Sequence, residues 1–317
     1  MTDHARGTGV LLMTYGSPSS LDDVGRYLTT VRGGRGPEPG LVDEFRRRYA
    51  VIGGSPLVEL TLAQAAALEA RLGSSVPVRA AMRFSEPSIE TALRELAGLG
   101  VGDVVAIVLS PQYSPLLMGG YAAALEAARQ AIGTAAPAVE VAGPWYREPA
   151  FVASLADRIR EALAGIEDSE PERVPVLLTA HSLPRRVADR EPGYLDQLRE
   201  SAELVAGAAG LDPGRWTFCW QSAGHEPGEW MTPDFADLMP ELRARGHRSV
   251  LVAPIQFLAD HLEILYDIDV GAREQAEAAG LAFHRIASLN VAPLFIEALA
   301  AVVTRSRTAG RMRVTSG

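Results

Sequence analysis

One pattern recurs eight times along the chain and constrains the fold more than any other feature. Short apolar, β-branched runs are each followed by a polar turn and then by a helical pattern of apolar residues. Strands that alternate with helices in this way form parallel sheets, because each parallel connection must cross a face of the sheet. The predicted strands are Gly9–Thr14, Val76–Met82, Val104–Leu109, Val139–Ala142, Val174–Thr179, Trp216–Gln221, Ser249–Pro254 and Leu281–Ala287.

The eight units divide into two sets of four that resemble each other. VLLMTYGSP at the first strand of one set is similar to VLLTAHSLP at the first of the other, and AIVLSPQYSP is similar to LVAPIQFLAD at the third. This duplication predicts two similar doubly wound α/β domains that face each other across a cleft. The segment GPWYREP, rich in proline and glycine, marks the boundary between them. The predicted parts are residues 1–145, residues 146–305 and a flexible basic tail at 306–317.

The composition of the 317 residues bounds the function. Hydrophobic residues make up 47% and charged residues 22%, which is typical of globular domains. The net charge of −9 argues against a nucleic-acid surface, which needs a basic footprint. Neither a signal peptide nor an apolar run of bilayer length is visible, and a single cysteine suits a reducing compartment. We expect a cytoplasmic protein, a monomer, with a small molecule as its partner.

The residues that follow the strands are the first candidates for a site, because open parallel sheets bind ligands beyond the carboxyl ends of their strands. Tyr15 follows the first strand of one half, and His181 stands at the corresponding place in the other half. We expect these two side chains on opposite walls of the cleft. Arg83, after the second strand, belongs to the same set.

The stretch LVAPIQFLADHLEILYDID is unusual because a buried strand runs into five titratable residues. Glu263 and Asp267 are four residues apart, so their carboxylates share a helix face and repel unless a cation or a proton lies between them. With His181 from another strand end, they offer the mixed nitrogen and oxygen ligands that suit Fe²⁺ or Zn²⁺. The alternative is ordinary structure: acidic side chains stabilising a helix N-terminus, and a hydrogen-bonded loop histidine.

Other patterns are less specific. Gly53 and Gly54 could line a phosphate or carboxylate site, or simply form a turn. Residues 117–120, LMGG, read as a flexible apolar loop, which fits a flat hydrophobic ligand and a packed loop equally well. Motifs for dinucleotides, for nucleoside triphosphates and for a serine nucleophile elbow are absent from the sequence.

Several segments together resemble one family. They extend in the family's order from Gly9 to about Val302, and the pair TAHSLP and DHLEILYDID is specific. The matching segments are LLMTYGSP, RYLTTVRGGRGPEP, RRRYAVIGGSPL, TAHSLP, CWQS, EWMTPD, ADHLEILYDID and SLNVAPLF. The chain resembles the ferrochelatases, and most specifically the coproporphyrin III ferrochelatases of Gram-positive bacteria. The resemblance implies two Rossmann-like, chelatase-type domains, each with a four-stranded parallel sheet flanked by helices, around a porphyrin cleft.

The resemblance also implies roles for individual residues. His181 and Glu263 would be the central pair that metalates the porphyrin and accepts pyrrole protons, with Tyr15 approaching the metal from the other face of the ring. Asp267 would be a metal relay or proton exit. Bending the macrocycle exposes its nitrogen lone pairs, and a nearby base then takes the protons. Whether His181 chiefly binds metal or accepts protons stays open, and we favour proton acceptance assisted by Glu263.

The choice of porphyrin depends on the number of propionates to be bound. Coproporphyrin III has four where protoporphyrin IX has two, so additional donors are expected. Basic and hydroxyl positions of the coproporphyrin type are matched here, and Arg83 completes the predicted substrate-binding set. These positions are Arg32, Arg35, Arg48, Ser55 and Tyr121. The arginines at 32, 35 and 46–48 form a cluster; most of them could instead be a solvated helix face, with only a subset meeting anionic groups.

Three alternatives stay open: a protoporphyrin IX ferrochelatase, a cobalt or nickel chelatase of another tetrapyrrole, and a non-catalytic porphyrin or haem carrier. Many relatives of this family hold an iron–sulfur cluster on four cysteines, and Cys219 is the only cysteine here. We therefore expect no cluster and no resident cofactor, with Fe²⁺ as a substrate and Cys219 as a buried strand residue.

Overall fold

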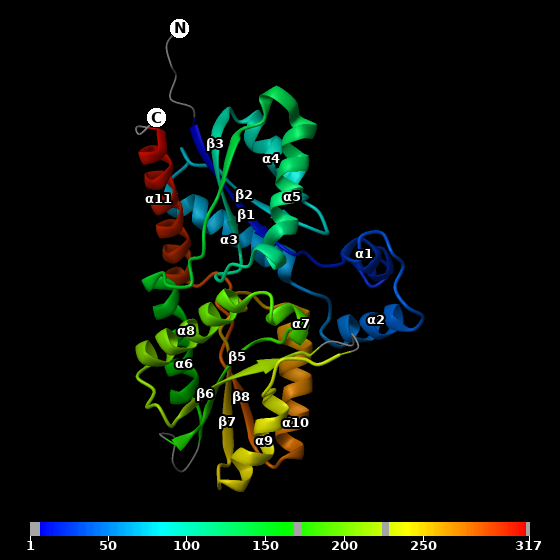
Figure 1. Cartoon of the computed structure of the whole chain (residues 1–317), viewed down its shortest axis with the longest axis vertical. Coiled ribbons are helices and arrows are strands. Elements are labelled where there is room, and N and C mark those ends of the chain that lie inside the picture. The colour runs from blue at the N-terminus through cyan, green and yellow to red at the C-terminus, as the bar shows by residue number, and fades with distance from the viewer. Residues whose placement is uncertain (1–6, 168–172, 224–227, 315–317) are drawn as a thin grey trace. The chain divides into compact units, whose positions relative to one another are not determined.

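The computed structural model describes residues 7–167, 173–223 and 228–314. The chain forms two compact units (Figure 1). Unit 1 comprises Met1–Glu148 and Asn290–Gly317, and unit 2 comprises Pro149–Leu289.

Unit 1 is built on a parallel sheet with the strand order β2-β1-β3-β4. Both faces of β1 are buried, since the consecutive residues Val10, Leu11, Leu12 and Met13 all have no exposed surface. Helices α4 and α5 cover the face that carries Leu11 and Met13, and α3 and α11 contact each other and the same sheet. The strands are β1 (Gly7–Thr14), β2 (Val78–Met82), β3 (Val101–Val108) and β4 (Ala138–Val141); the helices are α1 (Val24–Val31), α2 (Leu41–Val51), α3 (Leu57–Leu72), α4 (Ile89–Gly98), α5 (Pro115–Ile132), the short 3₁₀ turn η1 (Gly133–Ala135) and α11 (Pro293–Val314).

Unit 2 repeats this plan with the strand order β6-β5-β7-β8, again all parallel. Its core joins α9, η3 and α10 to the sheet through residues such as Met239, Ile264 and Ile268. Cys219 is fully buried on β6, as predicted. The strands are β5 (Val176–His181), β6 (Trp216–Gln221), β7 (Ser249–Pro254) and β8 (Ala282–Arg285); the helices are α6 (Pro149–Ala164), α7 (Arg185–Ala188), α8 (Pro192–Ala209), α9 (Phe235–Ala244), η3 (Glu263–Ala272) and α10 (Arg273–Ala278).

The two sheets share one topology, and the predicted fold class of two similar four-stranded α/β halves is confirmed. In each sheet the chain leaves the first strand toward one edge and later returns to pair on its other side. The first and third strands of each half, β1 with β3 and β5 with β7, therefore border a topological switch point, where the connecting loops diverge and leave room for a ligand.

The ends of the predicted domains differ from the observed units. The prediction placed residues 146–305 in the second half, but residues 290–317 belong to unit 1 because α11 packs against α3 and β3. Phe295 on α11 has no exposed surface and its ring lies 6.3 Å from that of Trp145. Helix α11 continues to Val314 and so enters the tail predicted at 306–317, whose flexibility stays a prediction; residues 315–317 lie outside the described part.

Two local expectations are also corrected. Residues 117–120 are not a loop but the first turns of α5, because the Ser114 side chain accepts the amide of Leu117 and Pro115 occupies the first helical position. The helical segment that begins at Glu263 is a π-helix, with bonds from each residue to the fifth one along, rather than an α-helix. The backbone hydrogen bonds of this segment therefore differ from those of the commoner α-helix.

Candidate active site

The switch point of unit 2 brings the predicted central pair together. His181 is the last residue of β5, and β7, its neighbour, ends at Pro254 and leads through a short loop into η3. Glu263 is the first residue of η3. The His181 Nε2 atom lies 3.9 Å from Glu263 Oε1, and both side chains are partly exposed, at 30% and 39%. His181 and Glu263, more than eighty residues apart in the sequence, therefore lie side by side at one edge of the sheet.

The His181 ring has a defined orientation and tautomer. Its Nδ1 atom lies 2.6 Å from the carbonyl oxygen of Ser182. A carbonyl can only accept, so Nδ1 carries the hydrogen, and in the neutral ring Nε2 keeps a lone pair. This lone pair is on the atom nearest Glu263, so it can bind a metal ion or accept a proton.

His261 is a third member of the site. Its Nδ1 lies 2.8 Å from the Ala259 carbonyl oxygen, and its Nε2 lies 3.1 Å from Glu263 Oε2. Because Nδ1 must donate to the carbonyl, the Nε2 contact contains one further proton, held either as imidazolium with carboxylate or as neutral histidine with carboxylic acid. The pair His261–Glu263 is therefore a place where a proton can be stored.

Electrostatics favour the charged form of this pair. Burial opposes a charge on His261, but the hydrogen bond and attraction to Glu263, with the charge of Asp267, raise its pKa above the ordinary value. Burial also opposes a charge on Glu263, yet His261 and His181 lower its pKa to about 2. Asp267 thus acts on the site through its charge, one π-helical turn beyond Glu263.

The elements around the pair hold it in place. The Phe257 ring packs against both imidazoles, with centroids 6.3 Å from His181 and 4.9 Å from His261. Arg285 on β8 makes two bonds to the Asp269 carboxylate, of 2.7 and 2.9 Å, and so fastens η3 to the sheet. No group of three or more His, Cys, Asp or Glu side chains in the described ranges is arranged to hold a metal ion.

A second cluster lies at the strand ends of unit 1. Tyr15 follows β1, is 43% exposed, and packs edge-on against Phe84 at 4.6 Å. The Arg83 guanidinium lies over Phe84 at 4.6 Å and over Tyr121 at 5.5 Å. Burial raises the pKa of the Tyr121 hydroxyl, so it stays neutral. In the described part of the chain, no carboxylate pairs with Arg83, which leaves its charge available to an anion.

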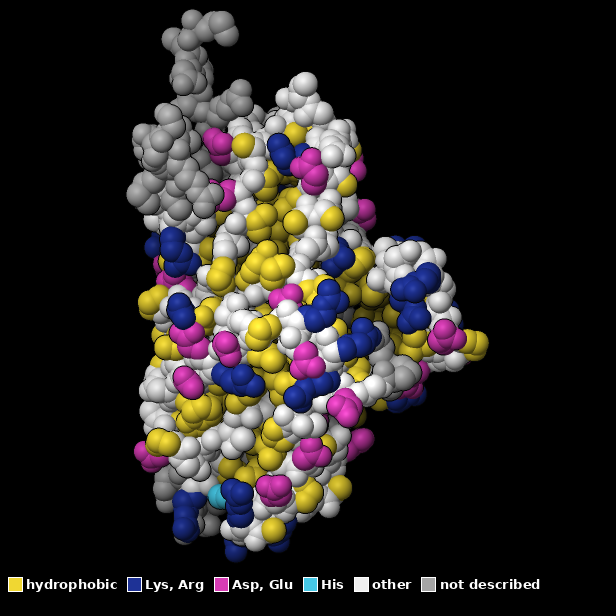
Figure 2. Space-filling model, viewed as in Figure 1, with side chains coloured by type: hydrophobic (Ala, Val, Ile, Leu, Met, Phe, Trp, Pro, Cys, Tyr) yellow, Lys and Arg dark blue, Asp and Glu magenta, His cyan; other side chains and the backbone are white. Residues whose placement is uncertain are grey.

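The remaining predicted substrate residues lie on and after α1 and α2, where basic side chains gather (Figure 2). Tyr27 of α1 donates to the Gly16 carbonyl and so ties this segment to the loop after β1. Arg48 is already paired, since its Nε lies 2.8 Å from Glu44 Oε1. The hydrogen bonds from Arg47 and Arg48 together lower the pKa of Glu44 to about 2. Arg32 has a buried Nε without a described partner, Arg35 is exposed and bonded to the Arg32 carbonyl, and Ser55 accepts the amide of Leu57.

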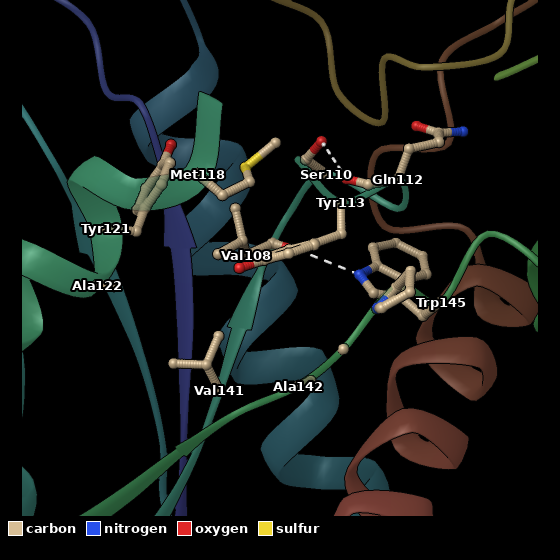
Figure 3. Close-up of a pocket in the computed structure, with 12 residues that line it drawn as sticks. Val108, Ser110, Gln112, Tyr113, Met118, Tyr121, Ala122, Val141, Ala142 and Trp145 are labelled. Carbon is tan, nitrogen blue, oxygen red and sulfur yellow. Dashed lines mark hydrogen bonds between the residues drawn. The ribbon is translucent and has the colours of Figure 1, made fainter. Parts of the chain in front are cut away.

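A pocket of about 200 Å³ opens beyond β3 in the same unit (Figure 3). Its walls are mainly apolar, with Met118 and Tyr121 from α5 on one side and Trp145 on the other. The Trp145 ring nitrogen donates to the Val108 carbonyl at 3.2 Å. Tyr121 is shared between this pocket and the Arg83 cluster.

The chain matches the family model described as Ferrochelatase over residues 7–307. It belongs to the ferrochelatase family. It is 39% identical to a ferrochelatase of Deinococcus radiodurans, over 94% of this chain and 95% of that protein. It is 37% identical to the coproporphyrin III ferrochelatases of Geobacillus kaustophilus and Bacillus subtilis, over 94% of this chain and 95% and 97% of theirs.

Solved structures support the chelatase fold of this ferrochelatase-family chain. SirB from Bacillus subtilis with Fe³⁺ superposes with a TM-score of 0.60 at 13% identity, covering 95% of both chains. CbiX, described as the terminal enzyme of sirohaem biosynthesis in denitrifying bacteria, superposes with a TM-score of 0.57 at 17% identity, covering 95% of this chain and 99% of its own. At these identities the likeness concerns the fold alone.

The resemblance read from the sequence is therefore confirmed, whereas the roles of single residues stay predictions. The strand-end rule located His181 and Glu263, but His261 and Phe257 were not among the predicted site residues of this ferrochelatase-family protein. A signal for His261 existed in its position two residues before Glu263. Among the described residues, no helix is both long and apolar enough to cross a bilayer.

Proposed function

We propose that this protein is a ferrochelatase that inserts Fe²⁺ into coproporphyrin III to give coprohaem. The observation that carries the proposal is the His181–Glu263 pair: a lone pair on Nε2, a carboxylate 3.9 Å away, and both groups open to solvent at a switch point. Membership in the ferrochelatase family, and 37% identity to coproporphyrin III ferrochelatases, support this metal and this porphyrin.

In the proposed reaction, Fe²⁺ replaces two pyrrole protons, which leave the macrocycle one after the other. His181 Nε2 accepts a proton, and the Glu263 carboxylate stabilises the imidazolium that forms. Glu263 Oε2 already accepts the His261 Nε2 hydrogen, so the proton from His181 is proposed to pass to the free Glu263 Oε1 and to leave from there toward Asp267. Tyr15 is proposed as a ligand that approaches the metal, and His181 as chiefly a proton acceptor.

The substrate preference is proposed to depend on guanidinium groups that bind propionates. Arg32, Arg35 and Arg83 have no carboxylate partner within the described residues, whereas Arg48 is already paired with Glu44. The first three are therefore the better candidates for an anionic substrate, with Ser55 and Tyr121 as neutral contacts.

The remaining proposals concern the setting of the reaction. We propose a cytoplasmic enzyme that acts as a monomer, has no nucleic-acid partner and holds no iron–sulfur cluster, since Cys219 is the only cysteine of the sequence.

The experiment is a wild-type assay with coproporphyrin III, protoporphyrin IX and sirohydrochlorin, each with anaerobic Fe²⁺ or with Co²⁺. We expect the highest kcat/KM with Fe²⁺ and coproporphyrin III. Turnover only with sirohydrochlorin would support a different chelatase, and binding without turnover would support a carrier.

Arg35→Ala should raise the KM for coproporphyrin more than for protoporphyrin. Arg94→Ala is the control, because Arg94 is an exposed arginine paired with Glu90.

A further inference from the structure

His181 lies where the sheet of unit 2 ends, and a side chain bonds its amide there. The last backbone bond from the β7 side is donated by Ile255 to the Thr179 carbonyl. The next amide of β5 facing that side is that of His181, and it donates to Gln256 Oε1 at 2.8 Å. The Gln256 amide group thus replaces a backbone carbonyl and extends the ladder by one rung after β7 has ended.

The other end of the Gln256 side chain is also held. Its Nε2 donates to the hydroxyl oxygen of Tyr194, a residue of α8 that is 3% exposed. Burial raises the pKa of this hydroxyl, so it remains a neutral acceptor. The carboxamide therefore bridges a buried tyrosine and the His181 backbone, with both of its polar ends used.

These bonds restrict His181 from both sides. On the β6 side the amide of Ser182 donates to the Gln221 carbonyl at 2.7 Å, and on the β7 side the amide of His181 is bonded to Gln256. The peptide groups before and after the His181 Cα are therefore both fixed. The ring itself is fixed by its bond to the Ser182 carbonyl, which leaves Nε2 facing Glu263.

We propose that Gln256 is a positioning residue for His181, acting together with Tyr194, and that it sets the direction in which Nε2 meets the porphyrin and the metal. The inference rests on the proposed function. Gln256 touches the His181 backbone and does not contact its reactive nitrogen. Gln256 also directly precedes Phe257, whose ring packs against both imidazoles.

The test compares Gln256→Leu with Gln275→Leu, the same chemical change at an exposed position of α10. We expect Gln256→Leu to lower kcat about tenfold or more with an unchanged KM for porphyrin, because displaced supporting groups cost activity on this scale. The Gln275 variant should match the wild type. Gln256→Asn, shorter by one methylene, should act like the leucine variant and replaces it if that protein does not fold.

A second readout does not depend on turnover. In ¹⁵N NMR spectra, Gln256→Leu should shift the His181 ring nitrogens and speed hydrogen exchange of the His181 amide, whereas Gln256→Glu, which keeps an acceptor oxygen, should preserve the slow exchange. Unchanged kcat and unchanged His181 signals in the leucine and asparagine variants would overturn the inference. A wild type that fails to insert metal while these NMR changes occur would instead overturn the proposed function.

Discussion

His261 contributes a proton to the site because both of its ring nitrogens have acceptors. The Ala259 carbonyl binds Nδ1–H, and the Glu263 carboxylate lies at Nε2. This arrangement depends on the loop that returns the Ala259 carbonyl toward a side chain two residues later. Sequence alone therefore indicated that His261 is titratable, while its place beside Glu263 required the coordinates.

The raised pKa of His261 predicts how stability depends on pH. A histidine whose pKa is higher in the folded state contributes stability that is complete below its unfolded value of 6.5, and this contribution is lost as pH rises through the folded value. The thermal midpoint of the wild type should therefore exceed that of His261→Gln most at pH 6, and the difference should shrink toward pH 9. A difference that grows with pH would contradict this assignment. Glu263→Gln is the control, because it removes the carboxylate that raises the pKa of His261.

At the scale of elements, the strands were predictable and some helices were not. Buried parallel strands are largely apolar runs, and Trp216–Gln221 and Ser249–Pro254 were predicted with their observed bounds. The segment LMGG at 117–120 was predicted as a loop, whereas Ser114 and Pro115 begin α5 just before it. The π-helical form of η3 has no periodic signature of its own in ten residues.

The glycine pair of α5 offers a matched test of the Arg83 cluster. A Cβ on Gly120 would lie 1.8 Å from Arg83 Nη2, whereas one on Gly119 would have no atom within 4 Å. Gly120→Ala should displace the guanidinium and raise the KM for coproporphyrin about tenfold, the scale of a lost hydrogen bond to a charged group. Gly119→Ala should leave KM unchanged and stabilise the helix by about 0.5–1 kcal/mol. Equal KM values in the two variants would contradict a role in substrate binding for the Arg83 guanidinium at its observed position.

At the scale of the whole molecule, duplication was readable from the sequence but the membership of the last helix was not. Both halves keep one strand order, so their repeated motifs predicted repeated sheets. The chain then returns from unit 2 to unit 1 through Asn290, whose carbonyl accepts from the buried Gln64 of α3 at 2.8 Å. The packing of α11 on α3, and not its position in the sequence, decides where it belongs.

This return predicts that a residue late in the chain stabilises the first unit. Phe295→Ala removes a fully buried ring beside Trp145 and should lower the free energy of unfolding by about 3–5 kcal/mol. Denaturant unfolding followed by tryptophan fluorescence measures this change. Val291→Ala, at a position that is 43% exposed, is the control and should change stability by less than about 0.5 kcal/mol. A small loss for Phe295→Ala would mean that α11 is not part of the core of unit 1.

The most direct test of the proposed chemistry is a single-turnover absorbance measurement with bound coproporphyrin III and anaerobic Fe²⁺. The wild type should form coprohaem, whereas His181→Ala and Glu263→Gln should bind the porphyrin with near-normal affinity and insert the metal at least about a hundredfold more slowly. His247→Ala and Glu277→Gln, elsewhere in unit 2, should behave like the wild type. Near-normal insertion by either site variant would contradict the roles proposed for His181 and Glu263.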